Sequence, residues 1–311
     1  MPSRAEARPS TVEPSSFDAI GVPWRIGVGS AETPTSMLGA PLAADDLEAV
    51  LARIERFDGD WSRFRDDSLV ARIAREPGSW RLPADAAPLF ELYEQLHELT
   101  DARVSPLVGA SLDRLGYDAA YRLSPAGDAL PAPSWPDTIA LRSTADGLTL
   151  DTVAPVQLDV GAAGKGYLVD LVGDVLAARG VTETLVDASG DVRVRGERSI
   201  RVALEHPADP SKAVGVAELT NAALCASAIN RRTWGNGLHH IVDAVTGLPI
   251  ADGVVATWVV AESALLADGL ATALFFVEPA RLCETFAFEW VRLSTHGRLD
   301  SSAGFRGELF A

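Results

Sequence analysis

The chain has 311 residues, of which 47% are hydrophobic and 23% are charged, a composition typical of a folded globular protein. Its formal net charge of −16 excludes binding to nucleic acid or anionic lipid by bulk electrostatic attraction, because such a field repels a polyanion. No stretch approaches the ~18 uninterrupted apolar residues of a membrane-spanning helix, and the first residues contain no apolar segment of a signal peptide. We therefore expect a cytoplasmic protein with no membrane span and no nucleic-acid partner.

The two cysteines indicate neither a metal site nor a disulfide framework. Cys225 and Cys283 are far apart, match no metal-binding spacing and lie among apolar residues. We expect two buried free thiols, because an unpaired cysteine behaves as a small hydrophobic residue.

The first half of the chain is predicted to begin with a disordered tail over residues 1–16, which is rich in proline, serine and charged residues. The remainder, residues 17–311, is predicted to form a single domain. Its first strand is expected from Ala19 to Val28, followed by a loop to Pro41. Apolar residues at helical spacing predict helices over residues 45–57, 69–75 and 88–100.

A stretch rich in proline, glycine and serine near residues 121–137 is predicted to be a flexible loop and a possible subdomain boundary. Strands are expected beyond it, at residues 138–141 and 148–152. Farther along, apolar residues follow the helical repeat, and Gly180 stands where a helix C-terminus favours glycine. This pattern predicts a helix that begins close to Lys165.

The second half alternates short strands with one further helix. Residues 184–196 predict a buried strand, a turn and a second strand, and residues 202–204 and 214–219 predict more strands. Apolar spacing predicts a helix over residues 263–276. Because strands and helices mix without a regular strand–helix–strand repeat, the predicted fold class is α+β and not a doubly wound parallel sheet.

Lys165 is unusual because only two of the 27 lysine and arginine residues are lysines. With Gly164 and Gly166 it resembles the end of a phosphate-binding P-loop. That motif fails twice, since Asp159 replaces its first glycine and Gly166 replaces the residue whose hydroxyl holds magnesium. What remains is a glycine-lined helix N-terminus beside an ammonium, which predicts an anion site, most simply for phosphate. The alternative is a lysine that only extends to solvent.

Asp268 and Thr272 lie one helical turn apart in an otherwise apolar segment, so their oxygens share one helix face. An aspartate among apolar residues usually has a partner or a ligand. Carboxylate and hydroxyl oxygens are ligands that Mg²⁺ prefers, often together with a substrate phosphate. For Thr272 the alternative is a hydrogen bond to the carbonyl one turn earlier.

A third element, residues 239–250, reads as a short strand that ends in an Asp/Thr/Gly/Pro turn. Asp243 is expected to cap this turn. His240 is a candidate general base for a hydroxyl, although a lone histidine is more often a core or surface residue. Residue chemistry alone therefore indicates Mg²⁺-assisted phosphoryl transfer or the binding of a phosphate ligand.

Together and in this order, the residues resemble the motifs of the ApbE family, the FAD:protein FMN transferases. The resemblance extends over about residues 17–311. The matching segments are Leu-Asp-x-Gly-x-x-x-Lys-Gly at 158–166, Asp-x-x-Gly-Asp at 187–191, the Ser227–Asn230 segment, His-x-x-Asp-x-x-Thr-Gly at 240–247 and Ala-Asp-x-x-x-Thr at 267–272.

The resemblance implies a T-fold-like α+β domain with antiparallel sheets and packed helices. It also implies that the domain binds FAD, splits the pyrophosphate with Mg²⁺ and attaches FMN to a Thr or Ser of a partner flavoprotein. The implied metal ligands are Asp268, Thr272 and the backbone carbonyl of Ala162, and the implied catalytic residues are Asp268 and His240. The implied FAD contacts are Asp159, Lys165, Val242, Ile20, Phe64, Val104 and Ser105.

Some positions depart from the family pattern. Ser105 stands where aspartate is usual, Ile20 stands where methionine is common, and Ala228 and Asn230 replace a glycine and a tyrosine. We predict an Mg²⁺-dependent transfer of FMN from FAD to an acceptor protein, with release of AMP. Two alternatives remain at this point: an FAD pyrophosphatase that forms FMN and AMP without an acceptor, and a non-catalytic FAD-binding protein.

Overall fold

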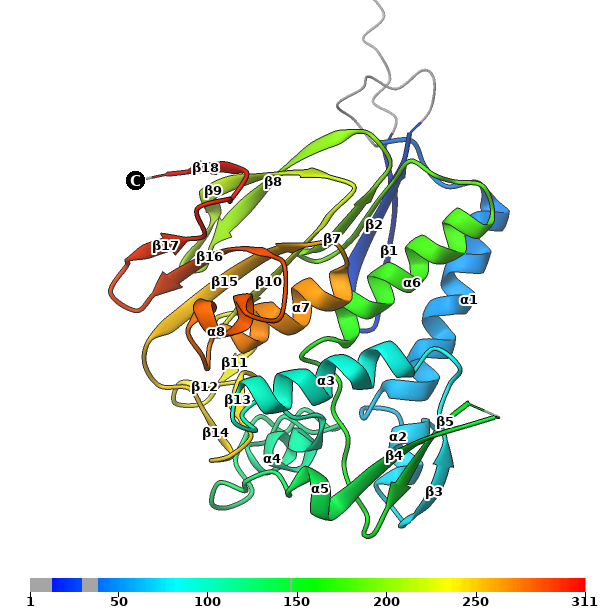
Figure 1. The fold of residues 1–311 in the computed structure, drawn as a ribbon, viewed down its shortest axis with the longest axis vertical. Helices are drawn as coiled ribbons and strands as arrows, with labels where there is room; N and C mark the ends of the chain where they lie inside the picture. The colour runs from blue at the N-terminus through cyan, green and yellow to red at the C-terminus, as the bar shows by residue number, and fades with distance from the viewer. Residues whose placement is uncertain (1–12, 30–38, 146, 311) are drawn as a thin grey trace, which may run out of the picture.

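An eight-stranded sheet forms the centre of the molecule in the computed structural model, which describes residues 13–29, 39–145 and 147–310 (Figure 1). All neighbouring strands in this sheet are antiparallel. In spatial order the strands are β1 (Ser15–Ala19), β2 (Val22–Val28), β6 (Thr184–Ala188), β7 (Asp191–Arg195), β10 (Ala223–Ala228), β15 (Val254–Ala261), β16 (Glu289–Ser294) and β17 (Leu299–Ser301).

Smaller antiparallel sheets surround the central one. One contains β18 (Gly307–Leu309), β9 (Asp209–Thr220) and β8 (Ser199–His206), and another contains β3 (Gly78–Arg81), β5 (Gly147–Thr152) and β4 (Ile139–Thr144). Two short ribbons pair β11 (Thr233–Trp234) with β12 (Leu238–His239) and β13 (Val242–Asp243) with β14 (Leu248–Pro249).

The helices lie mainly on one face of the central sheet, where α6 and α7 cross in front of it with α1 and α3 outside them (Figure 1). Within the described part of the chain, no helix has both the length and the apolar character needed to cross a bilayer. The helices are α1 (Ala44–Trp61), α2 (Leu69–Ile73), α3 (Ala87–Leu99), the 3₁₀ helix η1 (Pro106–Val108), α4 (Gly109–Arg114), α5 (Trp135–Thr138), α6 (Gly164–Ala178), α7 (Ala264–Ala273) and α8 (Pro279–Cys283).

The apolar residues of strand β15 (Val254–Ala261) contribute to two hydrophobic clusters. Its Val259 and Ala261 belong to the apolar cluster under the helices, whereas Ala256 and Trp258 belong to a second cluster with residues of β8 and β9. Successive strand residues point to opposite faces, so a strand buried on both sides is apolar on both faces. The exception in β15 is the buried Thr257, whose hydroxyl donates a hydrogen bond of 2.7 Å to the Ala271 carbonyl.

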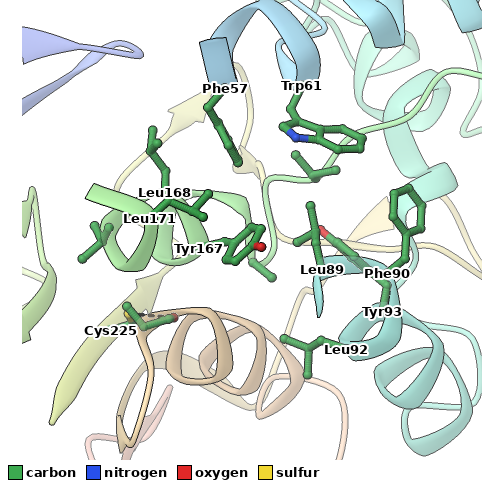
Figure 2. Packing of buried hydrophobic residues seen from close by; sticks show 14 of the residues in the cluster. Phe57, Trp61, Leu89, Phe90, Leu92, Tyr93, Tyr167, Leu168, Leu171 and Cys225 are labelled. Atoms are coloured by element: carbon green, nitrogen blue, oxygen red, sulfur yellow. Dashed lines mark hydrogen bonds between the residues drawn. The ribbon is translucent and has the colours of Figure 1, made fainter. Parts of the chain in front are cut away.

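Aromatic side chains join the outer helices to α6 (Figure 2). Trp61 of α1 packs against Phe90 of α3 with ring centroids 5.7 Å apart, and Phe57 meets the edge of Tyr167 of α6 at 6.4 Å. The Tyr167 hydroxyl donates a hydrogen bond of 2.5 Å to the Asp85 carbonyl. Large buried rings contribute most of the apolar area in such a layer, so these contacts fix where α6 begins.

Helices α6 and α7 pack closely together at Gly166. A Cβ atom on this residue would lie 2.2 Å from the Ala264 carbonyl oxygen and 2.6 Å from the Asp268 Cβ. Only glycine fits there. The close approach lets the Gly166 N–H donate a hydrogen bond of 2.9 Å to the Asp268 carboxylate.

The predicted α+β class is confirmed, since helices pack on antiparallel sheets. Residues 1–12 of the predicted tail lie outside the described residues, but Ser15 and Ser16 belong to β1, which pairs with β2. The predicted strand from Ala19 to Val28 is instead a tight β1–β2 hairpin turn followed by β2. Sequence could not show this turn, because its first residue, Ile20, adopts a left-handed φ of 47° that β-branched residues rarely take.

Two further predictions need correction. Cys225 is buried, but Cys283 is exposed, because it lies at the end of the short surface helix α8. The helix predicted over residues 263–276 ends at Ala273, and a turn follows it. The segment near residues 121–137 is loop as far as α5, and whether it divides the chain into subdomains stays a prediction.

Replacing Gly166 by alanine should lower the free energy of unfolding by about 1–3 kcal/mol, because the added methyl would force α6 and α7 apart. Gly59→Ala in α1 is the matched control: no atom lies within 4 Å of its Cβ position. That variant should be as stable as wild type or more stable by about 0.5–1 kcal/mol, since alanine favours helix. Urea denaturation measures both, and wild-type stability of Gly166→Ala would contradict the close contact.

Candidate functional site

A cavity of about 930 Å³ opens where the β1–β2 and β6–β7 turns, the start of α6 and the loops around α4 meet. Its wall combines residues from distant parts of the chain. All of the predicted site residues line it: Ile20, Phe64, Val104, Ser105, Asp159, Ala162, Lys165, His240, Val242, Asp268 and Thr272. The structure therefore brings these residues together, while the roles assigned to them stay predictions.

Lys165 occupies the inner end of the cavity. Its ammonium lies 2.5 Å from the Asp191 carboxylate and donates a hydrogen bond of 3.2 Å to the Ala188 carbonyl. Burial alone would lower the pKa of Lys165, but the carboxylates of Asp191 and Asp268 raise it above its ordinary value. The lysine is therefore held charged, which rules out a side chain that simply extends to solvent.

Two of the N–H groups at the start of α6, which were predicted to be free, already have partners. The Gly164 N–H donates to the Val160 carbonyl at 2.7 Å, and the Gly166 N–H donates to Asp268 at 2.9 Å. These two donors are not available to a phosphate. Anion binding at this end must therefore depend on the Lys165 ammonium more than on the helix N-terminus.

Asp268 faces the cavity from α7 and is only 4% exposed. Burial raises the pKa of its carboxyl well above its usual range, and the nearby Asp191 carboxylate raises it further. The Lys165 ammonium and the Gly166 N–H act in the opposite direction. Two buried carboxylates thus share one ammonium, so the Asp268 carboxyl favours its protonated form unless a cation compensates its charge.

Thr272 does not bond back to its own helix, as one reading of the sequence allowed. Its hydroxyl donates a hydrogen bond of 3.2 Å to the carbonyl of Ala162, in the turn before α6. Adjacent oxygens in an octahedral Mg²⁺ site are about 2.9 Å apart, given its short metal–oxygen distances. The two oxygens therefore lie at a separation that one small cation can bridge.

The donor set suits a hard divalent cation. Asp268, Thr272 and Ala162 offer a carboxylate, a hydroxyl and a carbonyl oxygen, and the uncompensated carboxylate charge favours a cation. In the described residues, no group of three or more His, Cys, Asp or Glu side chains is placed to hold a metal ion. A metal here would rely on few protein ligands and on a substrate phosphate, which is typical of Mg²⁺.

Arg63 and Asp159 form a second charged group in the cavity wall. The Arg63 guanidinium lies 2.5 Å from Asp159 and 2.7 Å from Asp113, and Gln157 donates to Asp113 at 2.6 Å. The other Asp159 oxygen accepts a hydrogen bond of 2.7 Å from the Gly161 N–H. Asp159 therefore shapes the turn that carries Ala162 and holds Arg63 in place.

Aromatic rings line the outer part of the cavity. Phe64 stacks on Tyr121 with centroids 5.3 Å apart, and Tyr117 stacks on Trp234 at 5.5 Å. Arg232 donates a hydrogen bond of 2.6 Å to the Tyr117 hydroxyl. Tyr121 is 53% exposed, so one face of this aromatic cluster is open to a flat ligand.

His240 lines the same cavity. Burial lowers the pKa of its imidazole to about 4, and the positive charge of Arg232 acts in the same direction. Its buried Nδ1 atom has no hydrogen-bond partner among the described residues. The ring is therefore neutral at neutral pH, and it has a nitrogen free to accept a hydrogen bond from a hydroxyl. Asp243 caps the following turn, as predicted, by accepting a hydrogen bond of 2.8 Å from the Val245 N–H.

The remaining predicted contacts form apolar or backbone parts of the wall. Val104 and Val242 are buried, and Ile20 is placed by the β1–β2 turn. The Ser105 hydroxyl accepts a hydrogen bond of 3.2 Å from the Leu107 N–H and so caps η1. The capping of η1 therefore accounts for a serine at position 105, independently of any contact with a ligand.

Several groups of the site were not assigned from the sequence. Asp191, Arg63 and Arg232 supply charge, and Tyr117 and Trp234 supply rings. Asp191 stands within the 187–191 segment that resembles a family motif, so its motif position could have suggested it. The other four lie outside the five matching segments, and their partners are far away along the chain.

The chain is similar in sequence to known proteins. The model of the ApbE family matches residues 20–291. A FAD:protein FMN transferase of Vibrio cholerae is 28% identical over 241 residues, which are 73% of this chain and 72% of that protein. One of Chlamydia trachomatis is 26% identical over 276 residues, which are 81% of this chain and 80% of that protein.

A solved structure extends the likeness to the fold. The flavin transferase ApbE from Vibrio cholerae has a TM-score of 0.74 with this chain at 20% sequence identity. The match covers 94% of this chain and 96% of that chain. At this identity the likeness shows that the two proteins share a fold.

The His240 imidazole should stay neutral until the pH falls toward its pKa of about 4. Because the ordinary histidine pKa is about 6.5, the neutral ring's contribution to stability is complete above about pH 6.5 and is lost as the pH falls toward 4. Histidine NMR shifts followed against pH measure the midpoint, with His240→Gln to assign the signal. A midpoint near the ordinary value would contradict the buried environment.

Proposed function

The chain belongs to the ApbE family, and from this premise we propose that it transfers FMN from FAD to a Thr or Ser hydroxyl of an acceptor protein, with Mg²⁺, and releases AMP. The observation that carries the proposal is the single cavity in which a charged lysine, oxygen donors for a cation and a neutral histidine meet. A pyrophosphate needs the first two, and a hydroxyl nucleophile needs the third.

In the proposed reaction, the acceptor oxygen forms a bond to the phosphorus of the FMN half of FAD. The bond from that phosphorus to the oxygen of the AMP phosphate breaks, and AMP leaves with the electron pair. His240 accepts the proton of the attacking hydroxyl at whichever ring nitrogen faces it. Lys165 holds the pyrophosphate oxygens, and its fixed ammonium lowers the cost of the charge that develops on the leaving phosphate.

Asp268, Thr272 and the Ala162 carbonyl would hold the Mg²⁺. When bound, this ion would neutralise negative charge on the pyrophosphate. The open aromatic cluster of Phe64, Tyr117 and Tyr121 supports the binding of a flat ring system, and FAD carries two. The cytoplasmic location expected from the sequence stays a prediction.

Incubation with FAD, Mg²⁺ and an acceptor flavoprotein domain tests the proposal. The expected products are free AMP and a flavin that remains on the acceptor after denaturation. AMP and FMN formed equally well without an acceptor would indicate an FAD pyrophosphatase instead. Intact FAD after incubation with Mg²⁺ and several acceptors would refute both reactions and leave a binding protein.

Asp268→Asn should reduce Mg²⁺-dependent AMP release by about a hundredfold or more, because a neutral amide cannot replace an anionic metal ligand. The variant should keep most of its affinity for FAD, which flavin fluorescence measures. Asp170→Asn, a buried carboxylate of α6 that does not line the cavity, is the matched control. Equal activity of Asp268→Asn and wild type would show that the metal lies elsewhere.

Lys165→Ala should raise the Michaelis constant for FAD about tenfold or more, because a charge-assisted hydrogen bond to phosphate is lost. The other lysine provides the control. Lys212 is 71% exposed and lies outside the cavity, so Lys212→Ala should leave the constant unchanged. Steady-state kinetics with varied FAD distinguishes the two variants, and equal constants for both would remove Lys165 from the substrate site.

A further inference from the structure

Asp191 is a buried charged group that the proposed reaction does not use. It begins strand β7, is fully buried and does not line the cavity. Its only charged partner among the described residues is Lys165, at 2.5 Å. Neither carboxylate oxygen has a hydrogen bond of good geometry with another described group, although the Cys225 thiol and the Ala226 N–H lie close enough to act against the burial that raises the pKa of this carboxyl. A buried carboxylate is costly unless it is paired, so this one depends on the lysine.

The ammonium of Lys165 lies between two carboxylates and pairs with only one of them. Asp191 is on the sheet side of α6, and Asp268 is on α7, which packs against α6 at Gly166. Among the ion pairs of the described residues, Lys165 is joined to Asp191 and not to Asp268. The carboxylate that it leaves unpaired is the one that faces the cavity.

The β6–β7 hairpin determines that Lys165 pairs with Asp191 and not with Asp268. Ser189 and Gly190 turn the chain with left-handed φ angles of 55° and 102°, and the Gly190 N–H closes the turn on Asp187 at 3.1 Å. The same hairpin presents both groups that hold the ammonium, the Ala188 carbonyl and the Asp191 carboxylate. Two contacts from one rigid turn fix the direction of a flexible lysine side chain.

We propose that Asp191 is a positioning residue that holds Lys165 away from Asp268 and thereby keeps the Asp268 carboxylate free for a divalent cation. This inference rests on the proposed function, because that function places the cation at Asp268 and the pyrophosphate at Lys165. Without Asp191 the ammonium would turn to the remaining carboxylate. Lysine and metal would then compete for the same oxygens.

Asp191→Asn tests this role, because the amide has nearly the same shape and no charge. Affinity for Mg²⁺ alone, measured by calorimetry without FAD, should fall about tenfold or more, as it does when a group that orients a metal ligand is lost. The Mg²⁺ concentration for half-maximal AMP release should rise by a similar factor. Asp170→Asn, which removes another buried carboxylate ion-paired at 3.6 Å, should leave both values unchanged.

A double variant separates competition from structural damage. In Asp191→Asn with Lys165→Met no ammonium remains to occupy Asp268, so Mg²⁺ affinity should return to within about threefold of wild type although FAD binding stays weak. Damage to the fold by Asp191→Asn would not be repaired by a second substitution. Unchanged Mg²⁺ affinity in the single variant, or no recovery in the double variant, would overturn the proposal.

Crystal structures of the wild-type protein with and without Mg²⁺ decide the matter if Asp191→Asn does not fold. Lys165 should pair with Asp191 in both. An ammonium on Asp268 in the metal-free crystal would overturn the positioning role. Wild-type protein that neither binds Mg²⁺ nor releases AMP would instead refute the proposed function, so the two failures are distinguishable.

Discussion

The site depends on two buried carboxylates that share one ammonium. Asp191 and Asp268 flank Lys165 at the junction of β7, α6 and α7, and only Asp191 is ion-paired with it. Burial raises the pKa of both carboxyl groups, and the Asp191 carboxylate raises the pKa of Asp268 further, whereas the Lys165 ammonium acts to lower both. A structure with a charge deficit of this kind is stable only if something else compensates it, by protonation or by a bound cation. The same uncompensated carboxylate charge that destabilises the fold therefore favours the binding of a cation at this site.

The scaffold is arranged around this junction. Gly166 allows α7 to approach α6 so closely that a backbone N–H of one helix bonds to a carboxylate of the other. Helix α1 packs on α6 through rings such as Phe57 and Tyr167 (Figure 2), and α3 packs on α7. Close packing transmits small shifts, so a methyl group added at Gly166 would disturb the charges as well as the core. Stability and site geometry are thus coupled at one contact.

The local parts of this arrangement could be predicted from the sequence. Helix α6 was predictable because apolar spacing and Gly180 are signals within one segment, and Asp268 with Thr272 was predictable as one helix face. The pairing of Lys165 with Asp191 crosses from a helix to a strand, and no periodicity encodes it. The resemblance to the family identified the cavity residues in chain order but gave no information on their contacts. The β1–β2 hairpin was missed for a different reason, since Ile20 adopts a conformation that its side chain disfavours.

The charges of the cavity also explain how an acidic protein can hold an anion. The chain has a net charge of −16, yet six cationic and three acidic side chains line the cavity. Most arginines at the cavity edge have a carboxylate partner that compensates their charge. Arg103 lies 3.8 Å from Asp243, and Arg231 lies 3.2 Å from Glu205. Arg232 has no carboxylate partner among the described ion pairs and donates to the Tyr117 hydroxyl. Beyond about 8 Å such charges are screened at physiological salt, so a phosphorylated ligand must be held by contacts within the cavity and not drawn in by the field of the whole molecule.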